Sequence, residues 1–167
     1  MDNKTTRKLA FAGILIAVGV VCSPLSIPVG ASKCFPVQHM VNVLAAVLLG
    51  PWYGVGMAFI TSLIRVLIGT GSLLAFPGSM CGALLCGIAF RYTKKLWLTY
   101  IAEVFGTSVI GGLLAYPVAV LLMKNQAAVL FGYILPFFVS TAGGTIIAAV
   151  LIFLLKRLNV LDRLRLN

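Results

Sequence analysis

The fold of this chain is decided by one apolar stretch, residues 37–68, with the sequence VQHMVNVLAAVLLGPWYGVGMAFITSLIRVLI. As a single helix it would be roughly 48 Å long, because each residue adds about 1.5 Å, whereas the hydrocarbon core of a bilayer is about 30 Å thick. Proline is tolerated in the first turn of a helix but not in its interior, so the helix is expected to break at Gly50 and Pro51. The stretch therefore predicts two consecutive helices, 37–49 and 51–68.

The whole chain has the composition of an integral membrane protein. Hydrophobic residues make up 61% of its 167 residues, 10% are charged, and the mean hydropathy is +1.11. A water-soluble domain needs more polar surface than this, so we predict an all-α bundle of six transmembrane helices that forms one domain over residues 1–167. The helices are expected near residues 9–25, 37–49, 51–68, 78–90, 97–123 and 128–155. Residues 69–77, GTGSLLAFP, are expected to form the turn between the third and fourth helices.

Basic residues mark one side of the membrane. They precede the first helix, separate the fourth from the fifth and follow the sixth, and they comprise Lys4, Arg7, Lys8, Arg91, Lys94, Lys95, Lys156, Arg157, Arg163 and Arg165. Because basic loops stay cytoplasmic and six helices return the chain to its starting side, both termini are predicted to be cytoplasmic. The same interface is expected to hold Trp52, Tyr53, Tyr92, Trp97 and Tyr100. Sidedness therefore explains the net charge of +10, which does not indicate nucleic-acid binding.

A cleaved signal peptide is an alternative interpretation of the first apolar run, since basic residues precede it. No small-x-small cleavage site stands before Pro24, however, and Val21 precedes Cys22 where a lipoprotein signal needs a small residue. The run is therefore expected to remain as the first helix of the bundle.

Motifs for catalysis and metal binding are missing from the sequence. The four cysteines are Cys22, Cys34, Cys81 and Cys86. They form no C-x-x-C pair and His39 is the single histidine, so buried packing is expected for the thiols rather than a disulfide framework or a metal site. Neither H-E-x-x-H, G-x-S-x-G nor a phosphate-binding G-x-x-x-x-G-K-[ST] loop is present. We therefore predict a protein that is not an enzyme, has no cofactor and does not itself hydrolyse ATP.

Glu103 is the only acidic residue within a predicted membrane helix. Isolated carboxylates inside the membrane serve proton relays, which makes Glu103 a candidate for ion-coupled transport. It follows Trp97 by six residues, so it is expected about 9 Å along the helix from the cytoplasmic interface. That position favours a structural role, in which the carboxylate reaches water or a nearby lysine.

Polar side chains gather in the outward half of the predicted bundle. Gln38, His39 and Asn42 open the second helix at its outer end and share one face, because they are three or four residues apart. Polar groups of other helices lie at a similar depth, which predicts a cavity for a small, largely neutral, aromatic solute. The candidate substrate-binding residues are Phe35, Gln38, His39, Asn42, Arg65, Ser79, Tyr116, Tyr133, Ser140 and Thr141. An alternative stays open for each of them, Arg65 and His39 included: the side chain snorkels to the interface or bonds neighbouring helices.

Pairs of small residues predict places where helix backbones approach one another closely. Gly78 and Gly82 form such a pair in the fourth helix, and Gly143 and Gly144 form another in the sixth. Packing within the bundle is the expected role of both pairs.

Two segments resemble the substrate-binding S components of energy-coupling factor (ECF) transporters, and most closely the ThiW family. They are KCFPVQHMVNVLAAVLLGPWYGVGMAFITSLIR, residues 33–65, and FPGSMCGALLCGIAFR, residues 76–91. The resemblance covers nearly the whole chain. It implies a six-helix vitamin-uptake protein of a prokaryotic plasma membrane, with hydroxyethylthiazole, the thiazole precursor of thiamine, as its solute.

The resemblance also implies partners and moving parts. Two cytoplasmic ATPases and a transmembrane coupling protein would supply the energy, while the S component topples in the membrane with its solute. In this family the first helix contacts the coupling protein through an Ala-x-x-x-Ala pattern, which GILIA matches here with Gly13 and Ala17. Residues 33–39 resemble a lid and its hinge.

Within such a site, the thiazole ring is expected to stack on Phe35, Tyr116 or Tyr133. Its hydroxyl and ring nitrogen would bond to side chains such as Gln38, His39, Asn42 or Ser140. Two other functions stay open: an S component for thiamine, its pyrimidine precursor or riboflavin, and a solitary ion-coupled carrier that uses the carboxylate in the fifth helix. An intramembrane enzyme has the least support from the residues.

Overall fold

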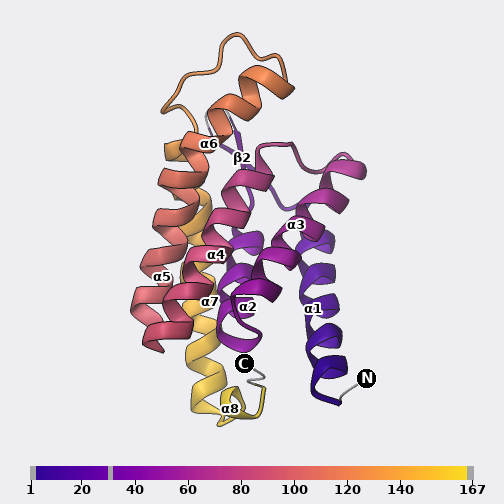
Figure 1. The fold of residues 1–167 in the computed structure, drawn as a ribbon, viewed down its shortest axis with the longest axis vertical. Helices are drawn as coiled ribbons and strands as arrows, with labels where there is room; N and C mark the ends of the chain where they lie inside the picture. The colour runs from indigo at the N-terminus through magenta and orange to yellow at the C-terminus, as the bar shows by residue number, and fades with distance from the viewer. Residues whose placement is uncertain (1–2, 30–31, 165–167) are drawn as a thin grey trace.

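The computed structural model describes residues 3–29 and 32–164 as a bundle of helices with a small antiparallel hairpin at one end (Figure 1). The helical elements are α1 (Asn3–Val21), α2 (Pro36–Leu48), α3 (Pro51–Leu67), α4 (Ala75–Thr93), α5 (Leu96–Phe105), η1 (Gly106–Gly111), α6 (Gly112–Pro117), η2 (Val118–Leu122), α7 (Ile134–Arg157) and α8 (Leu161–Leu164). The hairpin pairs β1 (Ile27–Val29) with β2 (Ser32–Cys34), so that Ile27 lies opposite Cys34. The elements from α5 to η2 follow one another without a break, and η1 and η2 have the wider π-helical hydrogen bonding. With these counted as one segment, the described part of the chain contains six long helical segments, as the sequence predicts.

The turn between α2 and α3 forms where the sequence predicts it. The backbone N–H groups of Leu49 and Gly50 both donate to the Ala45 carbonyl, at 2.8 and 3.0 Å, which ends α2. Gly50 has a φ of 95°, in the region that favours glycine, and Pro51 occupies the first turn of α3. The two apolar helices are thereby folded back on each other.

Helix α2 is the centre of the bundle although it is short. Every residue from 38 to 48 is buried, because α1, α3, α4 and α7 all pack against this helix. Its 13 residues extend only about 20 Å. Its polar first turn therefore lies deep within the bundle instead of at a surface.

Three predicted boundaries are wrong, each for a local reason. Helix α1 ends at Val21 rather than near residue 25, just ahead of Pro24. Helix α4 begins at Ala75 rather than near 78, because a proline fits within a first helical turn as Pro77 does here. Helix α7 begins at Ile134 rather than near 128. Before it, the Asn125 side chain accepts the backbone N–H of Ala127 at 3.1 Å and holds a turn.

Glycines set the closest helix contacts, as the small-residue pairs predict. A Cβ built on Gly78 would lie 2.9 Å from the Phe137 ring, and one on Gly144 would lie 2.7 Å from the His39 Cβ. Helix α4 also meets η1 backbone to backbone, since a Cβ on Gly106 would lie 2.9 Å from the Cys81 carbonyl oxygen. Gly143 is only in ordinary contact, 3.7 Å from Pro36. The close packing of α2, α4, η1 and α7 thus depends on glycine at these positions.

The two ends of the bundle differ in character. Helix α1 begins and α7 ends at the lower end in Figure 1, where α4 also connects to α5, while β2 and α6 lie toward the opposite end. We call these the basic end and the hairpin end, because the described basic groups in the first turns of α1, around the connection of α4 to α5, and at the end of α7 all lie at the former. Two segments, Leu96–Leu122 and Ile134–Arg157, are long and apolar enough to cross a membrane, and α2 and α3 are shorter apolar helices.

Candidate functional site

A pocket lies toward the hairpin end, among α2, α3, α4, η1 and α7. It contains about 390 Å³ of space between the protein atoms, part of which is open to the outside. Its lining residues are Lys33, Phe35, Gln38, His39, Arg65, Ser72, Leu74, Ala75, Gly78, Ser79, Thr107, Phe137 and Ser140. Apolar and polar side chains thus converge here from helices far apart in the sequence.

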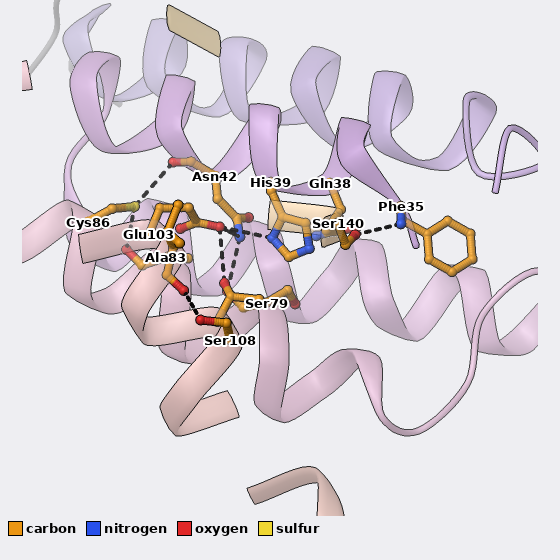
Figure 2. A network of polar contacts seen from close by, with 12 residues as sticks. Phe35, Gln38, His39, Asn42, Ser79, Ala83, Cys86, Glu103, Ser108 and Ser140 are labelled. Carbon is orange, nitrogen blue, oxygen red and sulfur yellow. Dashed lines mark hydrogen bonds and ion pairs between the residues drawn. The ribbon is translucent and has the colours of Figure 1, made fainter. Parts of the chain in front are cut away.

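A buried carboxylate organises the floor of the pocket. Three groups converge on Oε1 of Glu103: His39 Nδ1 at 3.0 Å, Asn42 Nδ2 at 3.0 Å and Thr107 Oγ1 at 3.3 Å. Figure 2 shows His39 and Asn42 pointing from α2 toward Glu103. We call Glu103, His39, Asn42 and Thr107 the carboxylate network.

The partners of Glu103 differ from those expected for it. The side chain is 0% exposed and bonds to α2 and η1, instead of reaching water or a lysine at the interface. Gly82 of α4 makes the space, because a Cβ there would lie 2.8 Å from Oε2 of the carboxylate. The prediction was wrong because it used only the position along one helix, whereas the short α2 brings its polar turn down to the level of Glu103.

A second cluster surrounds Arg65, which is 1% exposed. Its Nη1 donates to Oε1 of Gln38 at 3.0 Å, and its Cζ lies 3.6 Å from the centre of the Phe35 ring. The face of the guanidinium is thus covered by an aromatic ring and one nitrogen is bonded to an amide. Arg65 and His39 therefore turn into the bundle and do not snorkel, which excludes the interface interpretation for both.

The segment that closes the pocket is tied to α7. The backbone N–H of Phe35 donates to Oγ of Ser140 at 2.7 Å, and the Cys34 thiol donates to the Pro136 carbonyl at 3.1 Å. Burial raises the pKa of the Cys34 thiol, so it keeps its hydrogen for this bond. All four cysteines are unpaired in the structure.

Ser79 joins three helices at one side of the pocket. Its hydroxyl donates to the Ala75 carbonyl at 2.9 Å and lies 3.1 Å from Oγ of Ser62 in α3. Its backbone carbonyl accepts Nδ2 of Asn42 at 3.1 Å. Ser79 therefore links the pocket wall to the carboxylate network.

The structure brings most of the sequence-predicted site residues together and separates a few of them. Six line the pocket: Phe35, Gln38, His39, Arg65, Ser79 and Ser140. Asn42 lies one layer deeper, within the carboxylate network. Three do not line the pocket: Thr141, which is fully buried, Tyr116, which is half-buried in α6, and Tyr133, which packs 6.4 Å from Phe137 between ring centres.

Sequence reasoning missed several lining residues. Thr107 follows Glu103 by four residues, and Phe137 precedes Ser140 by three. These helical spacings alone could have placed both residues on the same helix faces as Glu103 and Ser140. Ser72 lies in a segment predicted only as a turn, and nothing in its sequence context marks it as a pocket residue.

The pocket is suited to holding a solute by hydrogen bonds and ring contacts. Phe35 and Phe137 provide aromatic surface, while Ser79, Ser140 and His39 provide polar atoms. Among the described residues, no group of three side chains is placed to hold a metal ion.

Comparison with known proteins gives one match. The model of the ThiW family, described as thiamine-precursor transporter protein, matches residues 9–158. Comparisons with curated proteins and with solved structures gave no match.

Proposed function

Because the chain belongs to the ThiW family of thiamine-precursor transporter proteins, we propose that it is the substrate-binding S component of an ECF-type importer. Its solute is hydroxyethylthiazole, which it delivers across the membrane with energy from ATP hydrolysed by partner subunits. The chain thus binds and carries the solute, and a transmembrane coupling protein and two ATPases drive the cycle.

One observation carries this proposal: a single pocket gathers six of the ten candidate binding residues from four parts of the chain. Buried polar groups are expensive in a membrane protein unless they bond to one another or to a ligand. Phe35 and Phe137 both line the pocket and are the proposed stacking partners of the thiazole ring, while Ser140, Ser79 and His39 are the proposed partners of its hydroxyl and ring nitrogen. We therefore assign these residues to the solute.

The proposed membrane arrangement is multi-pass, with both termini cytoplasmic. The basic end holds the exposed Trp52, Tyr92 and Trp97 beside the basic groups, a combination typical of a cytoplasmic interface. The pocket then opens toward the outer side. A C-terminal green fluorescent protein fusion should fluoresce and a C-terminal alkaline phosphatase fusion should be inactive, and the opposite result would refute this orientation.

The proposed docking surface for the coupling protein is the exposed face of α1. Gly13 and Ala17 are both exposed, and a Cβ on Gly13 would have no atom within 4 Å. Ala12 and Gly19, which are buried, face the bundle instead. Small residues on the exposed face permit close approach by another helix.

Solute binding is tested by isothermal titration of the purified protein. We expect heat with hydroxyethylthiazole and weaker or no binding of thiamine, its pyrimidine precursor and riboflavin. Tight binding of one of the other three, together with no heat from the thiazole, would assign the protein to another vitamin.

Coupling is tested by uptake in cells that contain the complete transporter. Gly13→Trp or Ala17→Trp is expected to abolish uptake and to leave solute binding intact, since neither residue lines the pocket. Ile146→Trp is the matched control, because Ile146 is 65% exposed on α7. Normal uptake by both α1 variants would exclude this docking surface.

The carboxylate network favours a second candidate function, a solitary ion-coupled carrier. A buried Glu103 bonded to a histidine is the kind of pair that proton relays use. Such a carrier would accumulate solute without partner subunits, and an uncoupler or Glu103→Gln would stop it. Accumulation that depends on the ATPases and survives the uncoupler would exclude it.

A further inference from the structure

The guanidinium of Arg65 is buried in the pocket wall without a negative partner. Its Nε and Nη2 atoms are both buried and have no hydrogen-bond partner among the described residues. Among the described residues no carboxylate forms a salt bridge with Arg65; Oε1 of Glu103 contacts His39 at 3.0 Å instead. A buried, uncompensated charge is costly in a protein interior.

The free atoms of Arg65 have a specific geometry. Nε and Nη2 lie side by side along one edge of the planar guanidinium, the edge that forms two parallel hydrogen bonds to a carboxylate or phosphate. Phe35 covers the flat face at 3.6 Å and Gln38 bonds the remaining nitrogen, Nη1, at 3.0 Å. The neighbouring side chains therefore hold the guanidinium in place, and the edge formed by Nε and Nη2 has no hydrogen-bond partner among the described residues.

Other polar groups around the pocket also favour an anionic partner for Arg65. Lys33 also lines it, whereas none of the lining residues is an aspartate or glutamate. Nε2 of Gln38 is a further buried donor without a partner. The buried acceptors without a partner, Oδ1 of Asn42 and Oε2 of Glu103, belong to the carboxylate network, so the unpaired groups beside Phe35 are the donors of Arg65 and Gln38.

We propose that the pocket selects a solute with an anionic group, a carboxylate in particular, which Arg65 binds through its Nε and Nη2 edge. The planar carboxylate matches the two free donors, and Phe35 and Phe137 hold the aromatic part of the same molecule. This inference rests on the proposed function, because it takes the pocket as the solute site. It adds to the proposed function the expectation that the acid form of the ring compound binds more tightly than its alcohol.

The test is isothermal titration with two pairs of probes. One pair is hydroxyethylthiazole and the thiazole acetic acid in which the same side chain ends in a carboxylate; the other is the hydroxymethyl and the carboxyl form of the aminopyrimidine. The acid of the preferred ring is expected to bind wild-type protein at least about tenfold more tightly than its alcohol, since hydrogen bonds to charged groups are about twice as strong as neutral ones. Arg65→Gln should reduce the preference for the acid over the alcohol to within about twofold. Arg65→Lys keeps the positive charge but cannot form the two parallel hydrogen bonds, so it should retain part of this preference.

Each outcome is decisive. An alcohol that binds wild-type protein as tightly as its acid overturns this inference and leaves the proposed function intact. Preference for the pyrimidine acid overturns the thiazole assignment and supports the role of Arg65. No binding of any of the four probes overturns both. If Arg65→Gln does not fold, the comparison within wild-type protein and Arg65→Lys still decides the question.

Discussion

Removal of Glu103 tests whether the carboxylate network holds the bundle together. Three buried groups converge on its Oε1, from His39, Asn42 and Thr107. Glu103→Ala leaves all three without this partner in the buried interior of the bundle. We expect the free energy of unfolding to fall by about 3–5 kcal/mol, the usual cost of breaking a buried charged pair by removing one partner.

A double-mutant cycle separates the pair from its surroundings. His39→Ala removes one donor, so its effect should be smaller than that of Glu103→Ala. The double variant should be less destabilised than the sum of the two, by about 0.5–3 kcal/mol, because the two side chains are in direct contact. Glu103→Gln is the matched control: it retains an acceptor oxygen and the shape, and should cost about 1–2 kcal/mol.

The assay is equilibrium unfolding in mixed micelles, with sodium dodecyl sulfate as the titrant and tryptophan fluorescence and circular dichroism as independent probes. The reasoning is refuted if Glu103→Ala unfolds within about 0.5 kcal/mol of the wild type, the range of an ordinary surface substitution. Strict additivity in the cycle would show that the 3.0 Å contact between His39 and Glu103 contributes nothing.

Three further predictions use neighbouring features. Gly82→Ala should destabilise the protein in the same titration, because the new Cβ would lie 2.8 Å from the carboxylate of Glu103. Gly13→Ala is the control and should not, since its Cβ would have no atom within 4 Å. Equal unfolding midpoints for the two variants would contradict the close packing of α4 against Glu103. Gly50→Ala should cost about 1–2 kcal/mol, since alanine disfavours positive φ, and an unchanged stability would show that the turn adopts another conformation. Ser140→Ala should speed solute dissociation about tenfold in stopped-flow measurements, because the bond to the Phe35 backbone is lost; an unchanged rate would exclude this bond as a latch.

The sequence predicts the break in the apolar stretch and the inward face of α2 well. Glycine and proline leave few conformations at positions 50 and 51, and spacings of three and four residues place Gln38, His39 and Asn42 on one face. For Arg65 the sequence left an inward position and snorkelling to the interface both open. Such features depend on local backbone geometry and on the free-energy cost of burying polar groups, and both can be inferred from a single sequence.

Rotation about the axis of an apolar helix is harder to predict. Both the lipid-facing and the protein-facing sides of α7 are hydrophobic, so its pattern does not show which side carries pocket residues. Ser140 therefore lines the pocket while the adjacent Thr141 does not. In the preceding segment, the π-helical turn η1 shifts the angular positions of the residues that follow it, and Tyr116 does not line the pocket.

Depth along the helices was predicted with uneven success. Glu103 was judged from its distance to Trp97, whereas its environment is set by α2, which is only 13 residues long and begins inside the bundle. Partners on other helices decide the role of a buried charge, and their identity comes from tertiary packing.

The most direct test of the solute site is an experimental structure with hydroxyethylthiazole or its acid bound. The account predicts ligand density between Phe35 and Phe137, within hydrogen-bond distance of Ser140 or Arg65. Density in the apolar groove that Tyr100, Phe105 and Phe138 line between α5 and α7, with the pocket empty, would contradict it.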